Sequence, residues 1–170
     1  MERDFAVARL RANSETVAAM VRWVSDDQAR WKPTPEAWSV LEVVCHLGDE
    51  EREDFRQRVD YILHRPGEPW PPIQPEAWVT ARAYNERDLT PMLDDFLRER
   101  HESLRWLRSL QDAAWERVVT HPRGGEIRAI DMLAAWVAHD HLHIRQLNEL
   151  HWQFLAGQVL PESLDYAGGW

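Results

Sequence analysis

The sequence predicts an all-α protein: a four-helix bundle whose second and third helices are joined by a long proline-rich connection. Apolar residues recur at intervals of three and four along four long segments, the period of an amphipathic helix. No convincing strand pattern is visible. The 170 residues fit a single domain, so we expect one bundle over residues 1–170.

The first two helices are separated by a proline-containing segment. Apolar periodicity predicts the first helix over residues 2–27, and the two prolines of WKPTPEAW, residues 31–38, end it. Ser39 followed three residues later by Glu42 is typical of a capping box. The second helix is therefore expected over residues 40–64.

The connection RPGEPWPPIQPEAW, residues 65–78, holds five prolines and a glycine. Such a composition favours an ordered loop over a helix or a central strand. Loops of this length are often functional, and Trp70 and Trp78 are candidates to cover a substrate pocket. After it, Thr90 and Pro91 are typical of the N-cap and first residue of a third helix.

The last long helix follows a turn. HPRGG, residues 121–125, predicts the turn, and the helix is expected from about Ile127 to about Ala156. Gly157 is expected to end it.

The composition excludes several classes of function. A net charge of −9 and a pI near 5.3 argue against nucleic acid and an anionic membrane as partners. No apolar run is long enough to span a membrane, and the charged N-terminus does not look like a signal peptide. The single cysteine, Cys45, implies no internal disulfide and is expected to be a packed core thiol. We expect a cytoplasmic protein that acts on a small molecule.

The stretch AAWVAHDHLHIRQL carries three histidines at alternate positions. His139 and His143 are four residues apart and differ by only about 40° around a helix, so they lie on one face. His141 is about 200° away and is expected to be a surface or interface residue. Two histidines one turn apart can grip a divalent metal, but they can equally be a hydrogen-bonded buried pair.

A metal site needs a third ligand, and His46 in the second helix is the strongest candidate. It lies among apolar residues, so if it is buried its polar atoms need a metal, a carboxylate or a carbonyl as partner. The acidic run of residues 48–54 is expected to be mostly a solvated face. Glu50 is the exception, because it is one turn after His46 and can hold water or act as a base. Arg145 can bind a substrate anion, or form a salt bridge within the bundle.

The chain resembles the DinB-like (DinB/YfiT-like) superfamily of four-helix bundle proteins over nearly its whole length. The resemblance rests on WKPTPEAWSVLEVVCHLGDEEREDF, on ARAYNERD and on MLAAWVAHDHLHIRQL. It implies a divalent metal, often nickel or zinc, bound by His46, His139 and His143, and frequent homodimers. Many relatives have His-Arg-Gly-Gln after the final ligand, whereas here Arg145 and Gln146 are displaced by one position.

The resemblance also implies a class of reaction. Characterised relatives include S-transferases and isomerases that use low-molecular-weight thiols. We therefore expect a metal-dependent enzyme of the thiol S-transferase type, or a related hydrolase, that activates a thiol or water at the three-histidine site. The alternatives are a non-catalytic metal-binding or stress-response bundle that acts through dimerisation or a protein partner, and a bundle whose histidines are structural and bind no metal.

Overall fold

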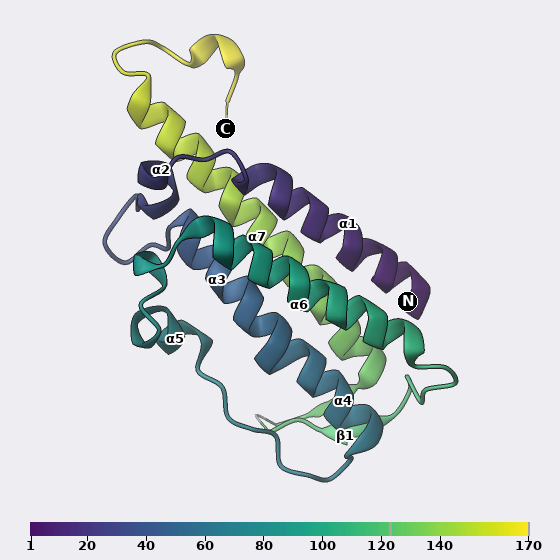
Figure 1. The fold of residues 1–170 in the computed structure, drawn as a ribbon. Helices are drawn as coiled ribbons and strands as arrows, with labels where there is room; N and C mark the ends of the chain where they lie inside the picture. The colour runs from purple at the N-terminus through teal and green to yellow at the C-terminus, as the bar shows by residue number, and fades with distance from the viewer. Residues whose placement is uncertain (123, 170) are drawn as a thin grey trace.

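Four long helices pack side by side, which confirms the predicted fold class (Figure 1). The structure is a computed structural model that describes residues 1–122 and 124–169. The long helices are α1 (Arg3–Val21), the helix of residues 40–64, α6 (Leu89–Ser109) and α7 (Ala129–Gln158). In the described residues, no helix is both long enough and apolar enough to cross a membrane.

The helix of residues 40–64 is continuous but changes its winding in the middle. It consists of α3 (Val40–Glu50), the five-residue π-helix η1 (Glu51–Phe55) and α4 (Arg56–His64). The expected capping box is present: the Ser39 hydroxyl accepts from the Glu42 amide at 3.1 Å, and the Ser39 amide donates to the Glu42 carboxylate at 2.8 Å. Single π turns inside α-helices occur frequently at functional sites.

The first helix is shorter than expected because a second cap interrupts it. After α1 ends at Val21, the Ser25 hydroxyl accepts a hydrogen bond from the Gln28 amide at 3.2 Å. This cap starts the separate short helix α2 (Asp26–Arg30), so the prediction of one helix over residues 2–27 is wrong at its C-terminal end.

The proline-rich connection is shorter than expected. Residues 65–74 contain no helix or strand, but α5 (Pro75–Ala81) begins inside the segment assigned to the loop. Pro75 stands in the first turn of α5, where a missing N–H costs no intrahelical hydrogen bond. The short 3₁₀ helix η2 (Tyr84–Glu86) follows.

The third helix begins two residues before its expected start. Asp88, not Thr90, is the N-cap of α6, and Leu89 is the first helical residue. Pro91 is therefore the third residue of the helix. A proline there is tolerated because the first four N–H groups of a helix have no partner within it.

A β-hairpin contradicts the expectation that the chain has no strands. β1 (Val118–Thr120) pairs antiparallel with β2 (Glu126–Arg128). Each strand has three residues, too short to show alternation in the sequence. The turn predicted at residues 121–125 joins them: Gly124 and Gly125 have φ of 94° and 83°, which favour glycine. Arg123 of the predicted turn lies outside the described residues.

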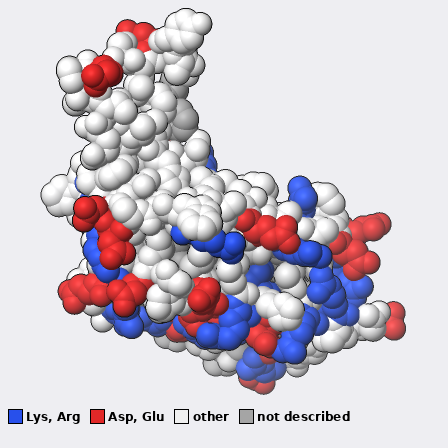
Figure 2. Space-filling view, turned by 45° about the horizontal axis from the view of Figure 1, so that its top comes forward, with Lys and Arg blue, Asp and Glu red and all other residues white. Residues whose placement is uncertain are grey.

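The last helix has about the expected length but lies two residues further along the chain, because Ile127 belongs to β2 and the helix begins at Ala129. Gly157 does not end α7, which continues to Gln158. This glycine does not have the positive φ that a glycine helix terminator adopts. The C-terminal part of α7 extends beyond the other three helices, and residues 159–169, including the 3₁₀ helix η3 (Asp165–Ala167), lie at that end (Figure 1). Figure 2 shows that this projection carries few charged side chains, whereas many acidic and basic side chains lie on the rest of the visible surface.

The apolar core has two parts, one toward each end of the bundle. One part is built around Val43, Leu47 and Phe96, and the other around Leu10, Leu107 and Trp136. Buried polar and charged side chains lie between these two parts, and they include His46 and the residues described below.

Candidate metal centre

Three histidines from two helices converge in the middle of the bundle. α3 supplies His46, and α7 supplies His139 and His143. The Nε2 atom of His139 lies 3.3 Å from Nε2 of His46 and 3.1 Å from Nε2 of His143. One nitrogen from each of the three rings can be chosen so that all three lie within 4.8 Å of one another. The structure thus brings together the three residues that the sequence suggested as ligands.

The hydrogen bonds of the rings leave lone pairs pointing at one another. The Gln146 side-chain oxygen lies 2.8 Å from Nδ1 of His143, so Nδ1 carries the proton and Nε2 has a lone pair. His139 can donate one N–H to only one of its two neighbours. Nδ1 of His46 is buried and has no partner among the described residues. The three neutral rings therefore have too few N–H donors for their two Nε2 contacts, and a cation would correct this shortage.

Burial keeps these rings neutral. Desolvation, followed by the neighbouring histidines, lowers the pKa of His46 to about 2. Desolvation and His143 lower the pKa of His139 to about 3, and desolvation lowers the pKa of His143. A metal binds the neutral form of imidazole, so the site has its ligands in the required state at neutral pH.

Aromatic rings hold the imidazoles in place. The Trp38 ring is parallel to that of His143, with centroids 6.2 Å apart, and its centroid lies 4.8 Å from that of His46. Phe55, in the π-helix, packs against His139 at 4.9 Å. These contacts limit the rotation of the rings, so that the convergence of their nitrogens is built into the fold.

The three histidines line a cavity of about 770 Å³. Trp38 and Glu50 form part of its wall, and residues 73–77, from the end of the proline-rich connection and the start of α5, form another part. The expected cover is therefore present, but from other residues: Trp70 lies in a neighbouring cavity, and the ring of Trp78 lies against Arg82.

Glu50 is the acidic residue of this cavity. It is 4% exposed, and its Oε1 has no hydrogen-bond partner among the described residues. Desolvation, together with the charge of Asp54 and a hydrogen bond to it, raises the pKa of Glu50 to about 8. A carboxyl group with such a pKa can take up or release a proton near neutral pH. The structure thus places Glu50 in the wall of the cavity that the three histidines line, and its role as a base stays a prediction.

The other predicted residues lie apart from the cavity. Arg145 and His141 are exposed on α7, and neither lines the cavity. A role for Arg145 therefore stays a prediction without geometric support. Cys45 is buried, and burial together with the charge of Asp49 raises its pKa to about 12, as expected of an inert core thiol.

Sequence reasoning missed a buried ion network on the other side of the histidines. Arg100 donates to Glu51 at 2.8 Å and, through two nitrogens, to both oxygens of Asp140 at 2.8 Å. The Trp136 indole donates to Glu51 at 3.0 Å, and the Asn13 amide to Asp140 at 3.2 Å. All three charged residues are about 1% exposed. This network joins α1, η1, α6 and α7.

A signal for this network existed in the sequence. Arg100 lies on the same three- and four-residue stripe as Phe96, Leu104 and Leu107, which face the core. An arginine in such a stripe predicts a buried cation with an acidic partner.

Comparison with known proteins supports the same fold. The model of the DinB superfamily matches residues 9–147. Among solved structures, YfiT from Bacillus subtilis, described as a probable metal-dependent hydrolase with an unusual four-helix bundle topology, superposes with a TM-score of 0.79. It is 23% identical, and the match covers 90% of this chain and 87% of that one.

A second solved structure is more distant. A mutant of mycothiol-dependent maleylpyruvate isomerase superposes with a TM-score of 0.69 at 10% identity. The match covers 86% of this chain but only 61% of that protein. No curated protein matches this sequence.

Proposed function

The chain belongs to the DinB superfamily, and from that premise we propose that it is a metal-dependent enzyme that activates a low-molecular-weight thiol or water. His46, His139 and His143 would hold one divalent metal, zinc or nickel. The observation that carries the proposal is the convergence of three neutral imidazole nitrogens on the wall of an open cavity.

The donor set fits such a metal. Three histidines are a known ligand set for catalytic zinc and leave a position for water or substrate. The hydrogen bond from His143 Nδ1 to Gln146 is the outer contact that fixes the tautomer of a ligating histidine. When bound, a divalent metal lowers the pKa of a coordinated thiol or water and so supplies a nucleophile at neutral pH.

The chain's own residues would perform the remaining work. The unpartnered Oε1 of Glu50 can accept a proton from a thiol or water that enters the cavity. Trp38 offers a flat apolar wall beside two of the histidines, and residues 73–77 restrict the entry of water and substrate. Both the acid and the base role would thus fall to one residue, Glu50.

Both candidate nucleophiles have support from the solved relatives. YfiT is described as a hydrolase, which uses water, and the more distant isomerase is described as mycothiol-dependent, which implies a thiol. We favour the thiol S-transferase reaction and retain hydrolysis as the second candidate. A homodimer remains a prediction. A non-catalytic metal-binding bundle is the competing function.

A transferase assay tests the proposal directly. Untagged protein, purified without chelator and loaded with zinc or nickel, is mixed with monochlorobimane and, in turn, cysteine, glutathione or coenzyme A. A parallel assay follows hydrolysis of p-nitrophenyl acetate. We expect a metal-dependent rate with at least one thiol, and a loss of that rate in His143→Ala.

Two further variants make the assay specific. Glu50→Gln should retain the metal and lower the rate by about a hundredfold or more, because proton transfer is lost. His141→Ala, on the outward side of α7, should leave the rate unchanged. A metal-loaded protein without metal-dependent turnover in either assay would support the non-catalytic function instead.

A further inference from the structure

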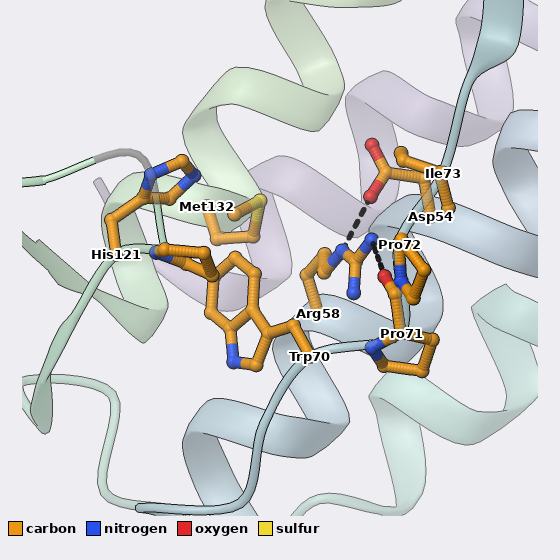
Figure 3. A pocket seen from close by; sticks show the side chains of 9 residues that line it. Asp54, Arg58, Trp70, Pro71, Pro72, Ile73, His121 and Met132 are labelled. Carbon is orange, nitrogen blue, oxygen red and sulfur yellow. Dashed lines mark hydrogen bonds and ion pairs between the residues drawn. The ribbon is translucent and has the colours of Figure 1, made fainter.

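Figure 3 shows a second cavity, of about 360 Å³, near the three-histidine cavity. Ile73 forms part of the wall of both. The second cavity lies between α4, the proline-rich connection, the turn that follows β1 and the start of α7. Its walls are mostly apolar or aromatic: Trp70, Pro71, Pro72, Pro122 and Met132, with the ring of His121 edge-on to Trp70 at 5.3 Å.

Arg58 is the one arginine or lysine among the described residues that line this cavity. It is 5% exposed. Its Nε donates to Asp54 at 2.8 Å, one terminal nitrogen donates to the Pro71 carbonyl at 2.7 Å, and its carbon Cζ lies 5.1 Å from the centroid of the Trp70 ring.

The remaining nitrogen of Arg58, Nη1, has no hydrogen-bond partner among the described residues. In Figure 3 it carries no dashed line and points toward the gap between Trp70 and Pro71. A buried donor without an acceptor costs free energy comparable to a lost hydrogen bond. An acceptor placed in this cavity would recover that free energy.

The charges nearby indicate what kind of acceptor fits. Asp54 already neutralises Arg58, so a carboxylate ligand would add a negative charge that no arginine or lysine among the described lining residues compensates. The net charge of −9 adds to this penalty. An uncharged acceptor, such as an amide or ketone carbonyl, can accept a hydrogen bond from Nη1 without adding a negative charge. The apolar walls favour an aromatic or aliphatic body next to the carbonyl.

We propose that this second cavity binds an apolar group that carries an uncharged carbonyl, with Arg58 Nη1 as the donor and the Trp70 ring as the wall. Ile73 lies in the wall of both cavities, so a group bound here lies beside the three-histidine cavity. That the bound group is part of the substrate rests on the proposed function, whereas binding itself does not.

Phenylacetamide is a suitable probe, and phenylacetate is its charged counterpart of nearly equal shape. Binding is measured by calorimetry and located by the shift of the Met132 methyl resonance. We expect phenylacetamide to bind at least about tenfold more tightly than phenylacetate. Arg58→Lys retains the charge opposite Asp54 but loses the planar donors, and should weaken phenylacetamide binding about tenfold.

Controls separate this inference from folding and from the metal site. Trp70→Ala, on the segment without helix or strand, should also weaken binding, and so tests the site if Arg58→Lys fails to fold. Arg56→Lys, on the same helix but paired with Glu99, should bind as wild type does. His46→Ala should retain phenylacetamide binding even if it abolishes turnover.

Two results would overturn the proposal. If phenylacetamide fails to move the Met132 resonance, this cavity does not bind an apolar group with an uncharged carbonyl. If phenylacetate binds as tightly as phenylacetamide, the argument from charge is wrong.

Discussion

Two polar clusters lie back to back in the centre of this bundle, and neighbouring residues divide between them. Glu50 and His139 face the three-histidine cavity, whereas Glu51 and Asp140, the next residues along the chain, face Arg100. Both clusters are buried polar groups between two apolar cores. Only in the cluster around Arg100 does each charge have a charged partner.

The difference indicates what each cluster is for. In the Arg100 network, two carboxylates and one guanidinium satisfy one another, so nothing is left for a ligand. In the histidine cluster, the rings have too few N–H donors for their contacts, and both His46 Nδ1 and Glu50 Oε1 are unpartnered in the described residues. The histidine cluster therefore has polar atoms that are free to bind a ligand, which is typical of a functional site. The Arg100 network has all its charges paired, which is typical of a structural role.

The largest expected effect is on the core side of this comparison. Arg100→Met leaves Glu51 and Asp140 buried without their cation, and we expect a loss of about 3–5 kcal/mol in the free energy of unfolding. Urea denaturation followed by circular dichroism measures it. Arg105→Met is the matched control on the same helix, because its partner Glu102 is also exposed, and it should cost less than about 1 kcal/mol.

A similar loss in both arginine variants would mean that the buried network contributes no more than a surface ion pair. The two clusters would then differ in geometry but not in energy.

The second prediction concerns the histidine cluster, where a bound metal should stabilise the folded protein. With free zinc at about a hundred times its dissociation constant, the wild-type protein should gain about 2.7 kcal/mol in unfolding free energy. His139→Ala should lose this gain, and His141→Ala should retain it because it faces away. Thermal or urea unfolding with and without zinc provides the measurement. Equal gains in both variants would show that zinc binds elsewhere.

The smallest effect, per residue, is a pH dependence of the metal-free protein. In the folded protein the pKa values of His46 and His139 lie below the ordinary 6.5. Below pH 6.5 these two histidines are therefore protonated in the unfolded chain but stay neutral in the folded one. Stability should therefore fall as the pH drops from about 6.5, by up to about 1.4 kcal/mol per pH unit for each histidine.

Glu50 works in the opposite direction. Its raised pKa means that the folded chain holds a proton which the unfolded chain releases above the ordinary 4.5, so its contribution falls as the pH rises toward 8. The measurement is therefore made in Glu50→Gln, with chelator, by urea unfolding between about pH 6.5 and 5.5. Adding His139→Ala to that variant should flatten the slope, and an unchanged slope would contradict the assignment.

Two of the three clustered histidines were predictable together because their geometry is local. The four-residue spacing of His139 and His143 fixes their common face, and it also places His141 on the outside. His46 needed only the expectation that its helix faces the last one. Cap residues predicted the start of α3 well, because Ser39 and Glu42 bond to each other and depend on little else.

What sequence reasoning missed depends on contacts between distant segments. Glu51 lies in an acidic run that appears solvated, and only Arg100, 49 residues later, shows that it is buried. The strands of the hairpin hold three residues each, so their pairing, not their pattern, defines them. The π-helix leaves no periodic signal, because five residues are too few to establish a period.

The π-helix also determines how two cavities share one helix. In an α-helix every fourth residue moves about 40° further round, so His46 and Arg58, three such steps apart, would diverge by about 120°. The wider turn of η1 absorbs part of that rotation, and the single segment 70–77 covers both cavities. If one residue of η1 were deleted, Arg58 would follow His46 by eleven residues, about 20° from it around a regular α-helix. The π turn therefore accommodates one extra residue while His46 and Arg58 stay on the side of the helix that segment 70–77 covers.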